Sequence, residues 1–387
     1  MSRTIRSKQQ TTNLDRWIVH LVALWRSMQG LSGARAAGSE LRPGEIAVLM
    51  RALRELTRGL DATRSLAGAG YMNRPDFAGA YLLYFWPVSY AQICWSLSEA
   101  GFTPPPHPWH ALDLGCGPGP AAFALADLGA ASVTCADASP RILGMVKSLA
   151  PHTRSRMITH LWDATRSSPL PSDSAPYDCI VAGHLLNELW PQSAGRIESR
   201  AALLEKALDL LVPGGTLLVI EPALRGPSRD LLAVRDILAG HGSRVVAPCT
   251  TVFPCPALLD PQATCHAAID WQPPPLLKAI ANASGPHREA LKMAWLAIRK
   301  EGGESPSVAE RYRVVSEPML NKAGRVRVLI CGPRGRFALS ASKADRSPAG
   351  LTFLKVKKGD LLQIHAPQER GLAWGVGEQT VVDIVGR

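Results

Sequence analysis

A glycine-rich loop and an acidic residue stand at spacings suited to binding a nucleoside. The loop reads ALDLGCGPG and carries, in order, Asp113, Gly115, Gly117 and Gly119. Glycine lets the backbone turn tightly and approach a ligand closely, because no Cβ stands in the way. Asp137 follows 18 residues after Gly119, at the predicted end of the next strand, where a carboxylate can hold both hydroxyls of a ribose. The loop and Asp137 therefore predict a site for a nucleoside-containing cofactor.

A third acidic residue and the spacing of the glycines narrow the class of cofactor. Asp163 follows the third predicted strand, in a position to meet an adenine amino group. The glycines are spaced G-x-G-x-G, unlike the G-x-G-x-x-G of nicotinamide sites. Loop, strand and acid together resemble the class I S-adenosylmethionine-dependent methyltransferases over about residues 106–316. The resemblance implies that Asp113, the three glycines, Asp137 and Asp163 bind S-adenosylmethionine.

The loop after the fourth predicted strand leaves methyl transfer open. It reads AGHLLNEL over residues 182–189, where enzymes that methylate exocyclic amines usually carry Asn/Asp-Pro-Pro-aromatic. A Pro-Cys or Thr-Cys loop, which RNA cytosine-C5 enzymes need for their nucleophile, is missing from the expected strand ends. His184 and Glu188 are the candidates for a base or a polar clamp. We favour ordinary structural roles for both, His184 in a loop and Glu188 in the first turn of a helix. A methyltransferase fold and a bound cofactor do not by themselves establish that the protein transfers a methyl group.

Four of the eight cysteines form a candidate metal site. Cys249, Cys255 and Cys265 are spaced C-x5-C-x9-C in a Pro-rich insert at about residues 246–272, and Cys331 is the only later cysteine. Four converging thiolates fit tetrahedral zinc or an iron–sulfur cluster, and the spacing alone leaves the metal undecided. His266 could replace one ligand. The other four cysteines lie in predicted helix, loop and strands, where core packing explains them, and no disulfide framework is expected.

The first 105 residues are predicted to be helical. Apolar residues recur at three- and four-residue spacing along the first helix: Leu14, Trp17, Ile18, Leu21 and Trp25. Residues 46–60 repeat this pattern after Pro43-Gly44, and Pro87 is expected to break or kink a third helix over residues 81–97. Three consecutive prolines at 104–106 predict a boundary.

From Trp109 onward, short apolar runs alternate with helical segments, which predicts a parallel sheet with right-handed crossovers. The expected strands are 110–114, 132–136, 157–162, 177–182 and 216–220, with helices near 119–129, 139–149 and 194–211. Residues 293–299 and 312–316 are expected to close this sheet as a final pair. Beyond 325, five further runs predict a small basic β domain: 326–330, 337–341, 352–356, 361–365 and 380–385.

The predicted fold class is therefore α/β. A Rossmann-like class I methyltransferase sheet is accompanied by an N-terminal helical region, a Cys-rich insert and a small C-terminal β-rich domain. The expected domains are residues 1–105, 106–318 and 319–387. A chain of 387 residues is long enough for two or three such units.

Composition excludes several classes of protein. With 46% hydrophobic and 19% charged residues, the chain is neither largely disordered nor collagen-like. No run of eighteen apolar residues occurs, so no membrane span is expected. The basic first ten residues lead into no apolar stretch, which argues against a secretory signal and leaves an organellar transit segment open.

The net charge of +11 is concentrated at the two ends of the chain. Residues 1–64 and residues 325–387 each carry 11 Lys or Arg against 5 Asp or Glu, whereas residues 65–324 carry 21 against 22. Lys and Arg placed on phosphates release condensed counterions, so two basic ends favour a nucleic acid as partner over a merely solvated surface.

Several motifs, in one order, identify a family resemblance. They are Tyr81…Trp86-Pro87…Tyr90-Ala91, the loop at 112–119, GHLLNEL at 183–189, PGGTLLVIEP at 213–222, SRDLL at 228–232 and Pro248-Cys…Pro254-Cys-Pro256…Cys265-His266. The chain resembles the methyltransferase-like small-ribosomal-subunit protein family over about residues 70–335. Mitochondrial members of that family assist assembly of the mitoribosomal small subunit. The resemblance implies S-adenosylmethionine binding, contact with small-subunit ribosomal RNA, and a [4Fe–4S] cluster on Cys249, Cys255, Cys265 and Cys331.

We therefore expect a protein that binds S-adenosylmethionine and small-subunit rRNA, carries an iron–sulfur cluster (zinc as the alternative) and assists assembly of the ribosomal small subunit. An active rRNA methyltransferase is the alternative, and a small-molecule methyltransferase is a third reading that leaves both basic ends unexplained. The chain is expected to be a monomer without a membrane partner, in the bacterial cytoplasm or, alternatively, the mitochondrial matrix.

Overall fold

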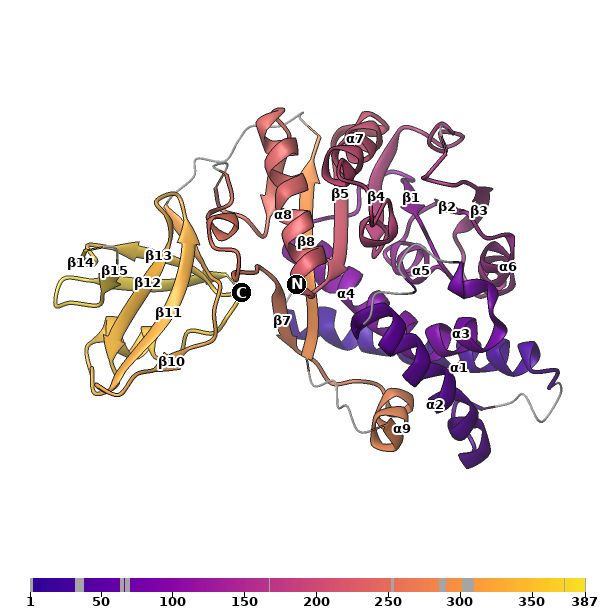
Figure 1. Cartoon of the computed structure of the whole chain (residues 1–387), viewed down its shortest axis with the longest axis horizontal. Coiled ribbons are helices and arrows are strands. Elements are labelled where there is room, and N and C mark those ends of the chain that lie inside the picture. Colours follow the sequence, from indigo (N-terminus) through magenta and orange to yellow (C-terminus); the bar gives the residue numbers. More distant parts are fainter. Residues whose placement is uncertain are drawn as a thin grey trace.

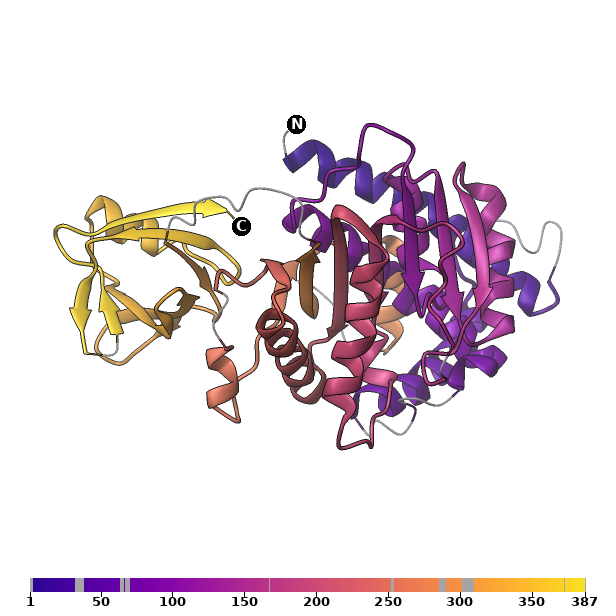
Figure 2. The same cartoon turned by 90° about the horizontal axis from the view of Figure 1, so that it is seen from above.

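The computed structural model describes residues 3–31, 38–62, 66, 70–166, 168–251, 254–284, 290–300, 310–371 and 373–386. Within these ranges the chain forms two sheets, and each belongs to a separate unit in space (Figures 1 and 2). The larger unit holds the first sheet and most helices, and the smaller unit holds the C-terminal strands. None of the helices in the described ranges is long and apolar enough to cross a membrane.

The first sheet has the strand order β3-β2-β1-β4-β5-β8-β6, with β7 paired to β8. Its strands are β1 (His110–Leu114), β2 (Ser132–Asp137), β3 (Arg156–Leu161), β4 (Tyr177–Gly183), β5 (Leu211–Pro222), β6 (Arg244–Ala247), β7 (Ala267–Asp270) and β8 (Ala290–Arg299). Strands β1 to β5 are parallel, whereas β8 runs antiparallel to β5, β6 and β7. The predicted α/β fold class with a Rossmann-like sheet is confirmed.

Helices cover both faces of this sheet. They are α1 (Arg3–Met28), α2 (Pro43–Thr57), α3 (Pro75–Ala80), α4 (Trp86–Glu99), α5 (Pro120–Asp127), α6 (Pro140–Leu149), α7 (Arg196–Asp209), α8 (Arg225–Gly240) and α9 (Pro275–Ser284). The N-terminal helices pack with α5 and α6 in one core, and α7 and α8 pack in a second core on the opposite face. Alternate residues of β1 divide between the two: Ala111 lies in the first core and Leu112 in the second, as the pleat requires.

The N-terminal helical region is confirmed, and its apolar stripe is buried. Trp17 and Leu21 in α1 are fully buried. A break or kink was expected at Pro87, and the structure has a change of helix type just before it. The π-helical turn η4 (Tyr81–Phe85) is followed directly by the α-helix α4, and Pro87 lies in the first turn of α4. Proline is tolerated there because the N–H groups of the first turn of an α-helix have no acceptor within that helix.

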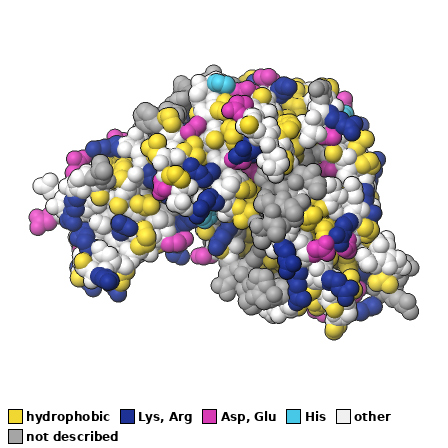
Figure 3. Space-filling model, in the orientation of Figure 1, with side chains coloured by type: hydrophobic (Ala, Val, Ile, Leu, Met, Phe, Trp, Pro, Cys, Tyr) yellow, Lys and Arg dark blue, Asp and Glu magenta, His cyan; other side chains and the backbone are white. Residues whose placement is uncertain are grey.

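The second sheet has the order β14-β15-β12-β11-β9-β13-β16, with β10 paired to β11. Its elements are β9 (Arg311–Val314), β10 (Met319–Leu320), β11 (Arg325–Gly332), β12 (Gly335–Ser342), α10 (Pro348–Phe353), β13 (Leu361–His365), β14 (Gln368–Arg370), β15 (Ala373–Gly375) and β16 (Val381–Gly386). The predicted C-terminal β unit is confirmed. In the space-filling view, Lys and Arg side chains lie on this unit and along its boundary with the larger one (Figure 3).

Two local predictions were wrong. The strand expected over residues 312–316 does not close the first sheet; as β9 it pairs with β11 and β13, because Tyr312 and Val314 are buried in the C-terminal core. Residues 352–356, expected as a strand, begin inside α10. Ser347 caps that helix by accepting a 3.0 Å hydrogen bond from the Gly350 N–H, and Pro348 opens its first turn.

Candidate functional site

The glycine loop makes a tight turn between β1 and α5. Gly115, Gly117 and Gly119 have φ angles of +64°, +51° and +87°, in the left-handed region that glycine adopts without strain. A Cβ on Gly115 would lie 2.6 Å from Leu185 Cδ1, so this position also needs glycine for packing. The Cys116 N–H donates to the Ala136 carbonyl over 2.9 Å, which fixes the loop against the end of β2.

The three predicted acidic residues lie in different environments. Asp113 is buried under the loop and accepts a 2.9 Å hydrogen bond from the Ala122 N–H of α5. It does not line the cavity that opens at the carboxyl ends of the parallel strands. Burial raises the pKa of Asp113 to about 7. Asp137 and Asp163 both line the cavity. The sequence grouped all three, but the structure brings only these two to the cavity.

Asp137 is tied to the backbone on both sides. Its carboxylate accepts hydrogen bonds from the Gly117 N–H (3.0 Å) and the Ser139 N–H (2.9 Å). Burial outweighs these bonds and holds the pKa of Asp137 above its usual range. Asp163 differs, because hydrogen bonds from the Thr165 side chain and backbone lower its pKa. Carboxylates at these two strand ends suit the ribose and base of a nucleoside.

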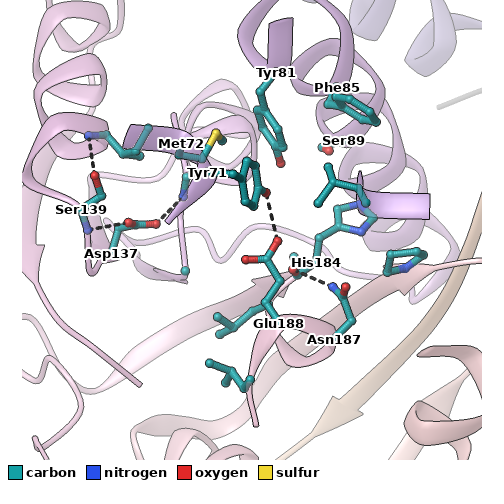
Figure 4. Close-up of a pocket in the computed structure, with 18 of the residues that line it drawn as sticks. Tyr71, Met72, Tyr81, Phe85, Ser89, Asp137, Ser139, His184, Asn187 and Glu188 are labelled. Carbon is teal, nitrogen blue, oxygen red and sulfur yellow. Dashed lines mark hydrogen bonds between the residues drawn. The ribbon is translucent and has the colours of Figure 1, made fainter. Parts of the chain in front are cut away.

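A cavity of about 1020 Å³ opens at the carboxyl ends of the parallel strands (Figure 4). Its lining comes from the glycine loop, the loops after β2, β3 and β4, the end of β5 and the start of β8. The helical turns η3 (Tyr71–Asn73) and η4 and one face of α4 complete it. Ligands of open α/β sheets bind in this region, where the loops leave the strand ends. Gly115, Gly117, His184 and Glu188 all line the cavity.

The loop after β4 brings His184 and Glu188, the two candidates for a base or polar clamp, to this cavity. His184 has a φ of +58°, an uncommon conformation for a side-chain-bearing residue, and its ring Nε2 lies 2.9 Å from Gln92 Oε1. Glu188, at the end of η6 (Leu186–Glu188), accepts a 3.0 Å hydrogen bond from the Tyr71 hydroxyl. Both residues therefore have partners from the N-terminal helical region.

Three residues that the sequence did not single out hold this arrangement together. They are Tyr71, Gln92 and Glu221. Glu221 ends β5 as a fully buried carboxyl that accepts hydrogen bonds from the N–H groups of Leu186 (2.8 Å) and Asn187 (3.1 Å). Burial raises the pKa of Glu221 to about 8. The Glu-Pro pair that ends strand five was visible in the sequence, but its role as an anchor for a loop was not.

The four cysteines of the candidate metal site are all half-buried and lie within electrostatic reach of one another. Burial, followed by the effect of neighbouring thiols, raises the pKa to about 12 for Cys249, about 11 for Cys265 and about 12 for Cys331. Burial also raises the pKa of Cys255. Among the residues that the structure describes, no three His, Cys, Asp or Glu side chains form a group that could hold a metal ion. The other four cysteines are buried, as expected.

Helix α8 holds the cysteine insert from one side. The Arg229 guanidinium donates to four insert carbonyls: Ala257 (3.2 Å), Leu258 (3.2 Å), Asp260 (2.7 Å) and Ala263 (2.9 Å). The Asp236 carboxylate accepts from the Cys255 N–H at 3.0 and 2.8 Å. Contacts with α8 therefore fix the insert at Cys255 and over residues 257–263.

The C-terminal unit holds the insert from the other side. Thr250 donates from its hydroxyl to the Cys331 carbonyl over 3.2 Å, and Arg313 donates to the Pro248 carbonyl over 3.3 Å. His266, the alternative ligand, lies 3.0 Å from Lys358 Nζ, and burial together with Lys358 lowers its pKa to about 4. A neutral His266 accepts from Lys358 through Nε2, so the ring is already engaged there.

The strand order, the glycine turn after β1 and the carboxylates after β2 and β3 define a chain with the fold of class I methyltransferases. A family profile described as mitochondrial small ribosomal subunit Rsm22 matches residues 76–360. The chain belongs to this family, as its sequence motifs predicted.

Solved structures align with parts of this chain at low identity. TehB from Haemophilus influenzae is 14% identical with a TM-score of 0.33, over 55% of this chain and 62% of TehB. TrmN from Thermus thermophilus is 24% identical with a TM-score of 0.29, over 36% of this chain and 42% of TrmN. An rRNA methylase from Streptococcus thermophilus is 16% identical with a TM-score of 0.32, over 54% of this chain and 96% of the methylase. The chain thus spans less than two thirds of TehB and TrmN. Among proteins with curated functions, none matches the chain.

Proposed function

We propose that the chain is a methyltransferase-like protein that binds S-adenosylmethionine and small-subunit ribosomal RNA and assists assembly of the ribosomal small subunit. The observation that carries the proposal is the cavity at the strand ends of a chain from a small-ribosomal-subunit family. The residues proposed to contact the cofactor are Gly115, Gly117, Asp137 and Asp163, which line the cavity. The other two predicted residues, Asp113 and Gly119, lie outside the lining and are proposed to hold the loop in place. The family description favours the mitochondrial matrix as the site of action, with the bacterial cytoplasm as the second location.

The cofactor half of the proposal rests on chemistry at the cavity. Asp137 and Asp163 offer carboxylates at neighbouring strand ends, and the left-handed Gly117 leaves room for a ligand against the backbone. A Cβ on Gly117 would meet no atom within 4 Å, so a long side chain there extends into open space beside the loop. Gly117→Arg is therefore suited to block the cofactor without a clash in the core.

The cofactor test uses the full chain and calorimetric titration with S-adenosylmethionine. Gly117→Arg should abolish binding, whereas Gly144→Arg, at an exposed and open glycine of α6, should leave it unchanged. Circular dichroism checks that both variants fold. Equal affinities for the wild type and Gly117→Arg would contradict the proposed cofactor site.

A [4Fe–4S] cluster on Cys249, Cys255, Cys265 and Cys331 is part of the proposal, with zinc as the alternative. The family resemblance supports this part, because four thiolates fit either kind of metal centre; the described residues themselves contain no group of three His, Cys, Asp or Glu side chains that could hold a metal ion. Anaerobic purification with iron, sulfide and zinc quantified tests this part. About four irons and four sulfides per chain are expected; one zinc without sulfide would replace the cluster by a structural zinc site.

The ribosomal half of the proposal is tested through RNA binding. Full-length protein and its Cys255→Ser variant are titrated with small-subunit rRNA at several salt concentrations. The variant is expected to lose metal and RNA affinity together, because the insert contacts the basic C-terminal unit. Unchanged rRNA affinity in metal-free protein would contradict a role of the insert in binding RNA.

An active rRNA methyltransferase is the second candidate, and the position of His184 and Glu188 at the cavity favours it. Transfer of label from S-adenosylmethionine to small-subunit particles, abolished by Gly117→Arg, would establish this activity. Particles that stay unlabelled while the chain binds them would leave assembly as the function.

A further inference from the structure

Three cations meet where the two units of the chain adjoin. Lys292 comes from β8 of the larger unit, Arg336 from β12 of the C-terminal unit, and Lys358 from the turn before β13. We name Lys292, Arg336 and Lys358 the boundary cluster. Figure 3 shows Lys and Arg side chains gathered along the boundary between the units. The three residues are far apart in the sequence, so only the fold brings them together.

His266 lies next to both lysines of the boundary cluster. Its Nε2 is 3.0 Å from Lys358 Nζ. His266 directly precedes β7, in which Ala268 is opposite Lys292 of β8. Residues two apart on a strand face the same side, so His266 and Lys292 share one face of this strand pair. Burial, Lys358 and Lys292, in this order, lower the pKa of His266. The neutral imidazole therefore offers the two lysines no compensating charge.

Lys358 is half-buried although its ammonium has no carboxylate partner. In the part of the chain that the structure describes, none of the three cluster cations lies within ion-pair distance of an acid. Burial lowers the pKa of Lys358, and Lys292 and Arg336 act in the same direction, whereas Glu317 and Cys265 oppose them. A lysine that served only solubility would keep its ammonium fully hydrated. The cluster thus holds positive charge at a partly desolvated place, which an anion beside it would stabilise.

Asp270 and Glu317, acidic side chains beside the boundary cluster, are both exposed. Asp270 pairs with the neighbouring Lys357 at 3.7 Å, and an ion pair so exposed contributes little. The C-terminal unit carries 11 Lys or Arg against 5 Asp or Glu over residues 325–387, so the cluster continues a basic surface. Lys292, at the other end, lines the cavity. Positive charge therefore extends from the C-terminal unit to the rim of the cavity.

We propose that the boundary cluster binds phosphates of an RNA strand that crosses from the C-terminal unit to the larger unit. This inference rests on the proposed binding of rRNA and names the surface that contacts it. Arg and Lys bind phosphate through charge-assisted hydrogen bonds, and each contact releases condensed counterions. A strand of phosphates can neutralise cations from both units at once, and it reaches Lys358 without having to displace a carboxylate.

The first test is chemical footprinting of lysines on the wild-type full-length protein. The protein is acetylated briefly with and without protein-free small-subunit rRNA, and then with intact small subunits, and the modified lysines are quantified by mass spectrometry. Protein-free rRNA should lower the acetylation of Lys292 and Lys358 by about threefold or more, because a bound phosphate covers each ammonium. Lys147, exposed on α6, is the control and should stay equally reactive.

The second test removes two charges of the cluster in the double variant Lys292→Gln/Lys358→Gln. Its slope of log affinity for rRNA against log salt should fall by about 1.4–1.8, and binding at about 0.1 M salt should weaken tenfold or more. Arg141→Gln/Lys147→Gln removes the same charge from exposed positions of α6 and should change neither quantity. Metal content is measured in both variants and should equal that of the wild type, which separates lost phosphate contacts from damage to the cysteine insert.

Unprotected Lys292 and Lys358 in rRNA-bound protein would overturn this inference and leave the binding of rRNA intact. An unchanged salt slope with lost metal in the double variant would also overturn it, because the cations would then serve the insert. Protection by intact small subunits but not by protein-free rRNA would replace the RNA strand by an acidic protein partner. A wild type that binds no rRNA would overturn both this inference and the proposed function.

Discussion

Tyr71 donates a hydrogen bond of 3.0 Å from its hydroxyl to Oε1 of Glu188, so a turn of the N-terminal helical region is joined to the loop after β4. In the same turn, η3, Asn73 Oδ1 accepts a 3.1 Å hydrogen bond from the Ser139 hydroxyl after β2. Both contacts lie at the cavity, and Figure 4 shows Tyr71 between Ser139 on one side and Glu188 on the other. η3 therefore closes one side of the proposed cofactor pocket.

Removing the Tyr71 hydroxyl tests this closure. Tyr71→Phe should lower the free energy of unfolding by about 1 kcal/mol, the usual contribution of one such hydrogen bond. If η3 closes on bound cofactor, the affinity for S-adenosylmethionine should also fall about fivefold. Urea unfolding and calorimetric titration measure the two effects.

Tyr90→Phe is the matched control for this variant. Tyr90 also donates to a carboxylate, Asp127 at 2.7 Å, but it lies outside the cavity. It should lose similar stability and keep full cofactor affinity. Equal loss of affinity in both variants would mean that Tyr71 acts only through global stability.

Stability should depend on pH through Glu221. Its pKa of about 8 in the folded chain lies far above the roughly 4.3 of an unfolded glutamate, because the site is buried. Between these pH values the folded state binds the proton more strongly, so the free energy of unfolding falls as pH rises. The slope from this one group is at most about 1.4 kcal/mol per pH unit.

Glu221→Gln removes this ionisation and keeps an oxygen for one of the two loop N–H groups, which donate to different carboxylate oxygens. Urea unfolding at about pH 5, 6.5 and 8 should show a smaller loss of stability in the variant than in the wild type. Asp113, whose pKa is raised to about 7, contributes with the same sign in both proteins, so the difference between them reports Glu221. Parallel curves would contradict a protonated Glu221.

The cysteine insert should open when Arg229 is removed. Its guanidinium holds four carbonyls between residues 257 and 263, and Arg229→Met leaves them without that donor. Hydrogen bonds to a charged group contribute about 1.5–3 kcal/mol each, so amide exchange in this segment should accelerate at least tenfold.

Hydrogen–deuterium exchange with mass spectrometry measures this opening. Arg225→Met, at an exposed position of the same helix, serves as control and should leave exchange in the insert unchanged. If amide exchange in the insert were as slow in Arg229→Met as in the wild type, the contacts with Asp236 and with the C-terminal unit would be sufficient to hold the insert.

Short-range patterns predicted most of the fold. The strand ends at Leu114 and Asp137 and the turn between them follow from alternation and glycine spacing, which need only neighbouring residues. Strand β9 was placed in the wrong sheet because its sequence fits either one. Its partner is decided by Tyr312, which is buried in a core made by residues that come later in the chain.

The candidate site was predicted only in its local part. Asp137 and Asp163 could be placed from their strands, whereas Tyr71 meets Glu188 across 117 residues and Gln92 meets His184 across 92. In sequence, Tyr71 and Gln92 read as ordinary aromatic and polar residues of helices. Their role comes from the way the N-terminal region folds over the sheet edge, which no local pattern encodes.

Binding of rRNA should depend on salt through the C-terminal unit. Arg327, Lys343 and Lys355 are exposed there, in a region with 11 Lys or Arg against 5 Asp or Glu. Each cation that neutralises a phosphate contributes about 0.7–0.9 to the slope of log affinity against log salt. Replacing all three by Gln should lower the slope by about 2 and weaken binding at low salt.

The matched control replaces three exposed cations of the neutral central region, Arg141, Lys147 and Arg154, by Gln. It removes the same net charge, so a general effect of charge would lower the slope equally in both triple variants. If the C-terminal unit contacts the phosphates, only the first variant should change the slope, because counterions are released only where cation and phosphate meet. Filter binding of small-subunit rRNA at several salt concentrations separates these two outcomes.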